Sequence, residues 1–224
     1  MSMRKYLKDE IRFLLFSEIY DRHSSPKAKR QALNILDSAI ELFAKKGFHA
    51  TTKKMIARHH GCSESLVTNY LGKLEDIQME SIKYTRYLFQ SYVVDEMTTK
   101  TTYTEMFKCY LESCILWPNH FQNHTSLWIS FLHQCTQDPQ LKRVNTIAVE
   151  IGFERLTELI RLGKEAGEFT YVDLELTAHS IHLIITGLLL SNASEEMGDK
   201  SDARFKAAKD YSLKILNPSL SEIL

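Results

Sequence analysis

The sequence predicts an all-α protein. Of its 224 residues only eight are glycine and four are proline, and few stretches alternate polar and apolar residues with the period of a strand. Apolar residues instead recur at spacings of three and four through most of the chain, as in amphipathic helices. We therefore expect a small three-helix domain toward the N-terminus, followed by a larger body of long helices.

The composition is that of an ordinary globular protein, with 44% apolar and 25% charged residues. The longest apolar run, Leu183 to Leu190, is far shorter than the roughly 20 residues that a membrane helix needs, so no membrane association is expected. Asp9 and Glu10 interrupt the only candidate signal peptide. The four cysteines show no CxxC spacing. This favours reduced thiols and a cytoplasmic protein.

The net charge of zero hides an uneven distribution along the chain. Residues 27–73 carry +6, residues 1–26 carry +1 and residues 74–224 carry −7. A basic segment beside an acidic remainder suggests a module that binds a polyanion, attached to a body that does not.

Residues 1–26 predict an extension with one amphipathic helix over residues 4–20. Three roles are open for this helix: packing against the body, entering a minor groove, or contacting another subunit. Its nearly balanced charge argues against a DNA-binding arm. We expect it to pack against the protein.

The second expected helix begins at the sequence Ser24 to Pro26, because serine caps helices and proline is tolerated at the first helical position. It runs to about Lys46, and Gly47 is expected to end it in a left-handed conformation. Two short helices follow, one over residues 53–60 that Thr51 or Thr52 can cap, and one that Ser63 caps and that ends near residue 71.

The remainder predicts six longer helices separated by proline, glycine and polar connections. Their expected ranges are 74–97, 103–116, 119–135, 139–165, 173–193 and 201–216.

The stretch Ile56 to Lys73 predicts a helix-turn-helix. Ala57 is small where two helices would cross, and Gly61, four residues later, can take the positive φ of the turn. Val67 is placed to pack back on the first helix, with Ile56 and Leu66 adding apolar contact. The N-terminal residues of the second helix would then face base edges in a major groove.

The stretch Ile35 to Ile77 resembles the DNA-binding domain of the TetR family of one-component bacterial transcriptional regulators. The shared motifs are A-x-E-L-F-x-x-x-G-F-x-x-T-T from Ala39 to Thr52 and I-A-x-x-x-G-x-S from Ile56 to Ser63, followed by an aromatic at Tyr70. The resemblance implies a helix-turn-helix domain over residues 27–73 and a helical effector-binding and dimerisation domain over residues 74–220.

The sequence departs from the family pattern at several positions of the third helix. Glu64 and Ser65 replace the usual Lys and Gly, Thr68 and Leu71 replace aromatic residues, and Leu74 replaces a Lys. A carboxylate repels phosphates but can accept a hydrogen bond from a cytosine amino group. A protein-interaction module that has lost DNA binding therefore stays open as an alternative.

The resemblance assigns roles to the helix-turn-helix residues. Asn69 can pair with adenine and Leu66 can contact a thymine methyl, whereas phosphate contacts fix the register and carry the salt-dependent affinity. The candidates for base edges are Glu64, Ser65, Leu66, Thr68 and Asn69. The candidates for phosphate are Thr51, Thr52, Lys53, Ser63, Tyr70 and Lys73, although Tyr70 could equally be a packing aromatic.

The family resemblance implies a homodimer built from the last two helices, over residues of about 173–216. The segment Glu175 to Asn192 is apolar on more than one face, as a helix between its own core and a partner would be. Gly187 would permit a close crossing. A central helix buried within one subunit is the alternative.

The middle helices are aromatic, which is typical of pockets for hydrophobic or aromatic effectors and also of ordinary cores. The candidate pocket residues are Tyr103, Phe107, Tyr110, Trp117, Phe121, Trp128 and Phe131.

No metal site, cofactor or enzymatic activity is expected. His120 and His124, and likewise His179 and His182, have helical spacing, but no cysteine or carboxylate completes a ligand set. No catalytic motif is present.

The hypothesis for function is a homodimeric repressor that a hydrophobic small molecule releases from a palindromic operator. The alternatives are a ligand-independent activator or nucleoid-associated protein, and the protein-interaction module that has lost DNA binding.

Overall fold

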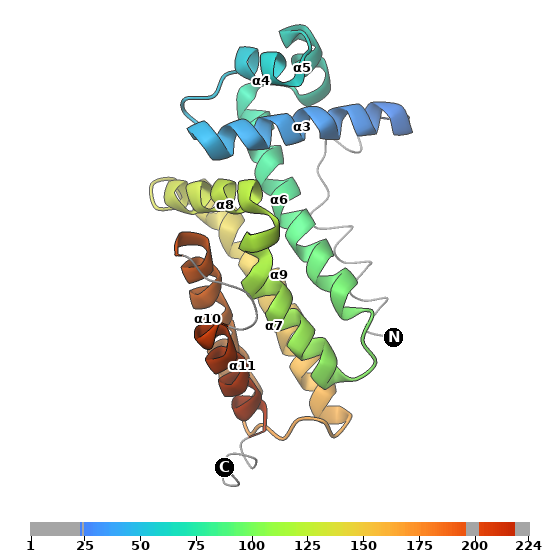
Figure 1. Ribbon diagram of the computed structural model, residues 1–224, viewed down its shortest axis with the longest axis vertical. Helices are drawn as coiled ribbons and strands as arrows, with labels where there is room; N and C mark the ends of the chain where they lie inside the picture. The colour runs from blue at the N-terminus through green and yellow to red at the C-terminus, as the bar shows by residue number, and fades with distance from the viewer. Residues whose placement is uncertain (1–22, 24, 196–201, 218–224) are drawn as a thin grey trace. The chain divides into compact units, whose positions relative to one another are not determined.

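The computed structural model describes residues 23, 25–195 and 202–217, and within these ranges the chain forms nine helices and no strand (Figure 1). The all-α prediction is confirmed. The helix predicted over residues 4–20 lies outside the described residues. The helices are α3 (Pro26–Lys46), α4 (Lys53–His60), α5 (Glu64–Leu71), α6 (Leu74–Met97), α7 (Tyr103–His120), α8 (Gln122–Cys135), α9 (Pro139–Glu165), α10 (Leu174–Ser194) and α11 (Ala203–Leu216).

The helix starts follow the side-chain caps that the sequence predicts. Ser25, Thr52 and Ser63 each accept a hydrogen bond from a backbone N–H in the first turn of α3, α4 and α5. Each cap satisfies a donor that the helix itself leaves without a partner. These boundaries are local in origin, because one side chain and the next few backbone groups determine them.

Two boundary predictions needed correction. α7 continues through Pro118 to His120, whereas proline was expected to separate two helices here. Gly47 has the expected positive φ of 80°, but its ψ of 166° places it outside the left-handed helical region. The backbone of Gly47 still bonds to Phe43 O, so the residue ends α3 without the predicted conformation.

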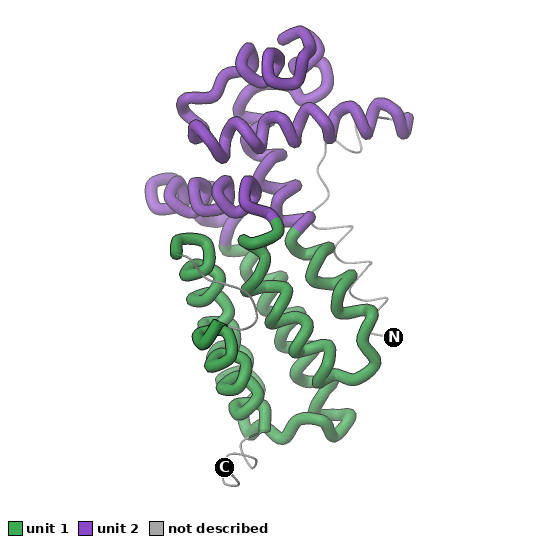
Figure 2. The backbone as a smooth tube through the Cα atoms, in the orientation of Figure 1, with its two compact units in different colours: residues 1–8, 89–120, 146–224 green, residues 9–88, 121–145 purple. Residues whose placement is uncertain are grey.

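The chain divides into two compact units (Figure 2). Among the described residues, unit 2 comprises residues 23, 25–88 and 121–145, and unit 1 comprises residues 89–120, 146–195 and 202–217. The chain passes from one unit to the other within α6, between α7 and α8, and again within α9. The predicted domain boundaries follow the sequence motif rather than packing, and they stay a prediction.

The core of unit 2 joins α3 to the helix-turn-helix and to α8. Ile35, Phe43 and Ile56 are fully buried in it, and Phe131 enters the same cluster from α8. Full burial of one such side chain stabilises the fold by about 1.5–3 kcal/mol relative to exposure. The buried apolar face of α3 thus holds the two short helices in place.

The core of unit 1 packs α7 against α10 and α11. Asn192 of α10 is buried and donates to the carbonyl of Ile115 in α7, with 2.7 Å between Nδ2 and O. At the end of α9, Gly163 leaves room for the ring of Phe169, because a Cβ at this glycine would lie 2.1 Å from Phe169 Cε2. Phe169 in turn contacts Phe107 edge to face.

Glu168 caps α7 from a distant part of the chain. Its carboxylate accepts hydrogen bonds from the backbone N–H groups of Tyr103 at 3.0 Å and Thr104 at 2.8 Å. Desolvation opposes ionisation of this group, but the hydrogen bonds from Thr104 and Tyr103 outweigh it and lower the pKa of Glu168. The pair of bonds fixes the start of α7 relative to the end of α9.

Candidate nucleic-acid interface

The α4–α5 pair has the geometry of a helix-turn-helix. Gly61 adopts the left-handed conformation, with φ 77° and ψ 34°, and its backbone closes α4. Ala57 and Val67, predicted to pack across the turn, are 4% and 0% exposed. Small and apolar residues at these two positions let the short helices approach closely.

One exposed face of α5 carries four of the five residues predicted to contact base edges. Glu64, Ser65, Thr68 and Asn69 are exposed, and their spacing of one and four residues places them on the same side of the helix. Val67 and Leu71 are buried on the opposite side, while Leu66 is half-buried between the two faces. The fold therefore gathers the predicted base-reading residues on a surface that a partner can reach.

The residues predicted to contact phosphate differ in exposure and in hydrogen bonding. Thr52 and Ser63 are exposed, and their hydroxyl oxygens accept the capping bonds of α4 and α5. Lys73 is exposed next to the start of α6. Thr51 is buried, and its hydroxyl donates to Gly47 O at 2.9 Å, so contact with a phosphate would require this bond to open.

Lys53 forms a hydrogen bond to the predicted reading face, the exposed side of α5 that carries Glu64, Ser65, Thr68 and Asn69. Its ammonium donates to Thr68 Oγ1 at 3.0 Å, and the Thr68 hydroxyl donates to Glu64 O at 3.1 Å. A predicted phosphate contact and a predicted base contact are thus joined across the turn. No sequence pattern indicates this pair, because the two residues stand 15 positions apart and meet only through the turn.

Tyr70 is half-buried and packs against the core of unit 2. Its ring lies 5.0 Å from that of His23, whose Nε2 is 3.2 Å from the Tyr70 carbonyl oxygen. His23 belongs to the predicted N-terminal extension, so this described part of the extension packs on the protein. The predicted phosphate contact of Tyr70 stays a prediction.

Histidines that sequence reasoning overlooked connect α4 to α3. The ring of His60 lies 3.0 Å from Ser38 Oγ through Nδ1 and 3.0 Å from Gln31 Nε2 through Nε2. His59 Nε2 lies 2.9 Å from Glu41 Oε2. Their helical spacing to the apolar residues of α4 could have placed them on the side of α3. These contacts fix the angle at which α4 leaves the core.

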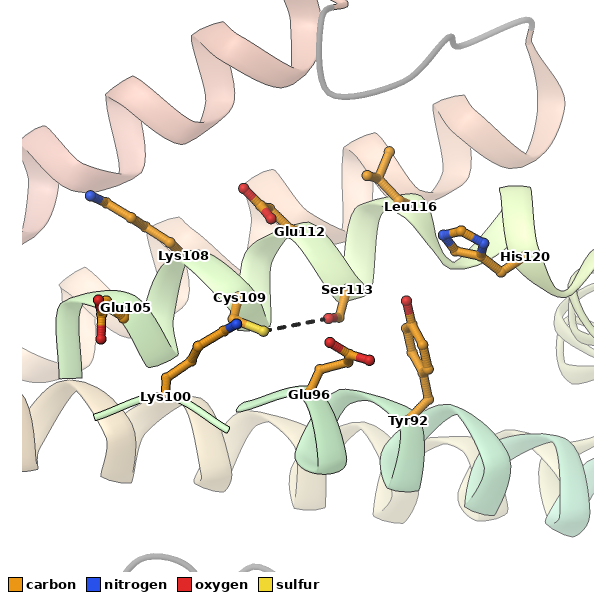
Figure 3. A pocket seen from close by; sticks show the side chains of 10 residues that line it. All are labelled: Tyr92, Glu96, Lys100, Glu105, Lys108, Cys109, Glu112, Ser113, Leu116 and His120. Atoms are coloured by element: carbon orange, nitrogen blue, oxygen red, sulfur yellow. Dashed lines mark hydrogen bonds between the residues drawn. The ribbon is translucent and has the colours of Figure 1, made fainter. Parts of the chain in front are cut away.

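A groove in unit 1 lies between α6 and α7, with a volume of about 360 Å³ (Figure 3). None of the seven aromatic residues predicted to form an effector pocket lines it. In unit 1, Phe107, Tyr110 and Trp117 are buried and Tyr103 is half-buried; in unit 2, Phe131 is buried and Phe121 and Trp128 are half-buried. An effector site among these residues stays a prediction.

Within the described ranges no three His, Cys, Asp or Glu side chains gather as a metal site. Of the paired histidines, His124 bonds to Thr85 Oγ1 at 2.8 Å and His179 stacks on Phe153.

Two family models match the chain. Residues 35–72 match the model described as bacterial regulatory proteins of the tetR family, and residues 118–215 match the model described as BetI-type transcriptional repressor, C-terminal. The first match covers the helix-turn-helix, and the second covers most of the helices that follow α6. No curated protein matches the chain.

Solved structures share the fold at low sequence identity. A transcriptional regulator from Saccharomonospora viridis, crystallised with choline, is 21% identical with a TM-score of 0.70, over 81% of this chain and 95% of that one. A TetR regulator from Haloarcula marismortui is 18% identical with a TM-score of 0.69, over 84% and 96%. AibR, crystallised with isovaleryl coenzyme A and operator DNA, is 16% identical with a TM-score of 0.60, over 84% and 98%.

The two matched segments together cover more than half of the chain. The first holds α4, α5 and most of α3, and the second holds α8, α9, α10 and nearly all of α11. The helix-turn-helix geometry and the shared fold agree with them. The chain therefore belongs to the TetR family of transcriptional regulators.

Proposed function

We propose that this protein is a cytoplasmic, homodimeric repressor that leaves a palindromic operator when a small molecule binds its helical body. The proposal rests on one observation: the chain has both an exposed polar reading face on α5 and an exposed apolar stripe on α10. The first feature suits DNA, and the second suits a second copy of the chain. No catalytic activity is proposed.

The reading face of α5 would enter the major groove. Asn69 offers an amide that pairs with adenine in two hydrogen bonds, and Glu64 can accept from a cytosine amino group. Lys53 and Lys73 would contact the phosphates on either side. One helix of eight residues covers few base pairs, so useful specificity needs two copies spaced by about one turn of DNA.

The apolar stripe of α10 supports a homodimer. Leu176, Leu183 and Leu190 are 67%, 70% and 37% exposed and stand seven residues apart, so they lie along one side of the helix. Gly187 lies between the last two, and apart from its own helix backbone and chain neighbours nothing lies within 4 Å of where its Cβ would be. A row of exposed leucines beside an open glycine is typical of a helix that packs closely against another.

A membrane is a weaker account of the same helix. α10 has the length and the mean hydropathy, 1.4, that a membrane span requires. Its other side, however, buries the polar side chains of Thr177 and Asn192 against α7 and α11. A helix that packs on its own subunit through one face and exposes leucines on the other fits a subunit interface better.

Two observations support a response to an effector: the helix α6 runs from one unit into the other, and solved relatives contain bound small molecules. α6 begins beside the reading helix in unit 2 and ends in unit 1, where the groove lies. A molecule bound against the end of α6 can therefore bias the position of its start. Two of the solved relatives were crystallised with small molecules, choline and isovaleryl coenzyme A. Coupling between such sites is typically worth about 1–3 kcal/mol.

The test is selection of binding sites from a library of duplex DNA at two salt concentrations. We expect a palindromic site with steep salt dependence. Asn69→Ala should relax the preference at one position of each half-site, while Asn119→Ala, on the exposed end of α7, should leave it unchanged. Salt-dependent binding without sequence preference would favour the nucleoid-associated alternative. No binding in any condition would favour the interaction module.

A further inference from the structure

We infer that the groove between α6 and α7 binds a small zwitterion, which places a positively charged nitrogen at Tyr92 and Glu96 and an anionic group at Lys100. The inference deepens the proposed effector response and rests on it for the regulatory consequence. Binding in the groove itself is independent of DNA.

The groove has two facing walls from one hairpin of helices. Tyr92 and Glu96 stand one turn apart on α6, and Lys100 follows in the connection to α7. The opposite wall comes from α7, where Cys109 and Ser113 point toward α6 (Figure 3). A volume of about 360 Å³ is at the small end of the range for ligand sites, which is about 300–1,000 Å³. The groove therefore suits a molecule the size of an amino acid.

One end of the groove suits a cation. Figure 3 shows the carboxylate of Glu96 beside the ring of Tyr92, both pointing from α6 toward α7. The Tyr92 ring is held by Trp117, with ring centroids 5.8 Å apart. A fixed aromatic face next to a carboxylate attracts an ammonium group through both the ring quadrupole and the charge. Ser113, buried on the opposite wall, adds a hydroxyl that can accept from an N–H.

The other end suits an anion. Figure 3 shows the Lys100 side chain reaching across to Cys109, and Lys108 lies on the same half of α7. Glu105, which also lines the groove, accepts hydrogen bonds from Thr101 Oγ1 and from the N–H of Thr102. The Glu105 charge is therefore engaged at the start of α7, which leaves Lys100 as the charged group that meets the ligand at this end.

The separation of charge decides between a zwitterion and a single ion. A ligand with only a positive charge would be attracted by Glu96 but repelled by Lys100. A ligand with only a negative charge would be attracted by Lys100 but repelled by Glu96. Like charges a few ångströms apart repel each other even at the effective dielectric of a protein surface. Glu112, between the two ends, lies 4.0 Å from Lys209 of α11 and is partly balanced within the protein. A molecule with both charges meets attraction at both ends.

The position of the groove gives the bound zwitterion a route to the reading helix. Glu96 and Tyr92 lie on the last two turns of α6, and the first residue of α6 follows α5 after two residues. A ligand that draws the end of α6 toward α7 therefore acts on a helix whose start adjoins the DNA-binding element. The chemistry of the effector follows from charged groups of α6 and α7 rather than from the aromatic core.

The experiment is titration calorimetry of the full-length protein without DNA. The zwitterionic probes are β-alanine, γ-aminobutyrate and 5-aminopentanoate, and the single-charge probes are butylamine and butyrate. We expect one zwitterion to bind at least about tenfold more tightly than either single-charge probe, because removal of one of its two ionic interactions costs about 1.4 kcal/mol or more. Glu96→Gln and Lys100→Met should each weaken that zwitterion by about tenfold. Glu154→Gln, an equal charge change at an exposed site of α9, should not.

Three results would overturn the site. They are equal affinity for butylamine or butyrate, no binding of any probe up to about 10 mM, or wild-type affinity in the Glu96→Gln and Lys100→Met proteins. A second arm measures operator binding with and without the zwitterion. Binding without release from DNA would contradict the proposed repressor mechanism and leave the site standing. If an unrelated molecule released the protein from DNA and no zwitterion bound, the repressor mechanism would stand and the zwitterion site would be contradicted.

Discussion

Lys53 donates a hydrogen bond to Thr68 across the helix-turn-helix, with 3.0 Å between Nζ and Oγ1. The lysine comes from the first residue of α4 and the threonine from the exposed face of α5. The bond thus connects a residue predicted to contact the DNA backbone with one predicted to contact the bases. Because both groups are accessible to water, we expect the bond itself to add less than about 1 kcal/mol to stability.

Substitution of the two partners should separate their roles on DNA. Lys53→Met should lower the slope of log K against log salt by about 0.9 for each subunit, or about 1.8 for the proposed dimer, and weaken binding to all sequences alike. Thr68→Val leaves Lys53 free to contact phosphate, so the salt slope should stay while the sequence preference changes at one position of each half-site. Equilibrium binding at four salt concentrations, on the selected operator and its point variants, measures both. If the two variants give the same salt slope, Lys53 does not contact phosphate.

Gly163→Ala should destabilise the body. The added Cβ would meet the buried ring of Phe169 at 2.1 Å, so the ring or the end of α9 must move. Overpacking of this kind costs about 1–3 kcal/mol. Urea denaturation of the purified protein measures the free energy of unfolding.

Gly152→Ala on the same helix is the matched control. A Cβ there would lie 3.5 Å from Gln90 Nε2, an ordinary contact, and alanine is the better helix former by up to about 1 kcal/mol. This variant should be as stable as the parent or slightly more so. Equal destabilisation of both variants would show that the Phe169 ring yields easily and that its packing on Gly163 is not rigid.

The part of the fold set by local signals could be predicted from the sequence. Ser25 and Thr52 cap their helices as expected, and Gly61 takes the positive φ that the turn requires, because each depends on only a few neighbouring residues. The exposed face of α5 follows in the same way from helical periodicity.

The features that could not be predicted from the sequence depend on packing between residues far apart in the chain. α7 continues through Pro118 because its neighbours Leu116 and Trp117 are buried and hold the helix together, a tertiary effect that outweighs the local preference of proline. The bond between Lys53 and Thr68 depends on the angle across the turn. The groove depends on which faces of α6 and α7 meet, so its charged lining could not be inferred from the aromatic content of the region.

His124 should make the protein sensitive to acid. Burial lowers the pKa of His124 from 6.5 to about 4; its Nδ1 lies 2.8 Å from Thr85 Oγ1 and its ring contacts those of Tyr84 and Phe121. Since the unfolded chain takes up this proton first, the stabilisation is complete above about pH 6.5 and is lost as the pH falls toward 4. The loss amounts to roughly 3 kcal/mol, at 1.36 kcal/mol for each pKa unit.

His124→Gln removes the titrating group, so its unfolding free energy should fall less steeply than that of the parent between pH 7 and pH 4. His133→Gln is the control, because His133 lies exposed on the same helix. Denaturant unfolding at half-unit steps of pH gives the two slopes. A His124→Gln protein with the acid sensitivity of the parent would show that other groups carry the effect.

Leu183→Glu should convert the protein to a monomer. Leu183 is 70% exposed at the middle of the α10 stripe, so its substitution costs little within one subunit. In a dimer it would bring two carboxylates together in an apolar contact, where each unpaired charge costs several kcal/mol. Sedimentation equilibrium should give the monomer mass, and operator affinity should fall by at least about a hundredfold, because a single reading helix has too few contacts for specific binding.

Ile147→Glu is the control variant. Ile147 is 53% exposed on α9, so the substitution introduces the same charge at an exposed apolar residue outside α10 and α11. Retention of the dimer in this variant and its loss in Leu183→Glu would assign the interface to the stripe. A Leu183→Glu protein that stays dimeric and folded would exclude the stripe as the interface. A monomer that keeps full operator affinity would instead break the argument that two reading helices must act together.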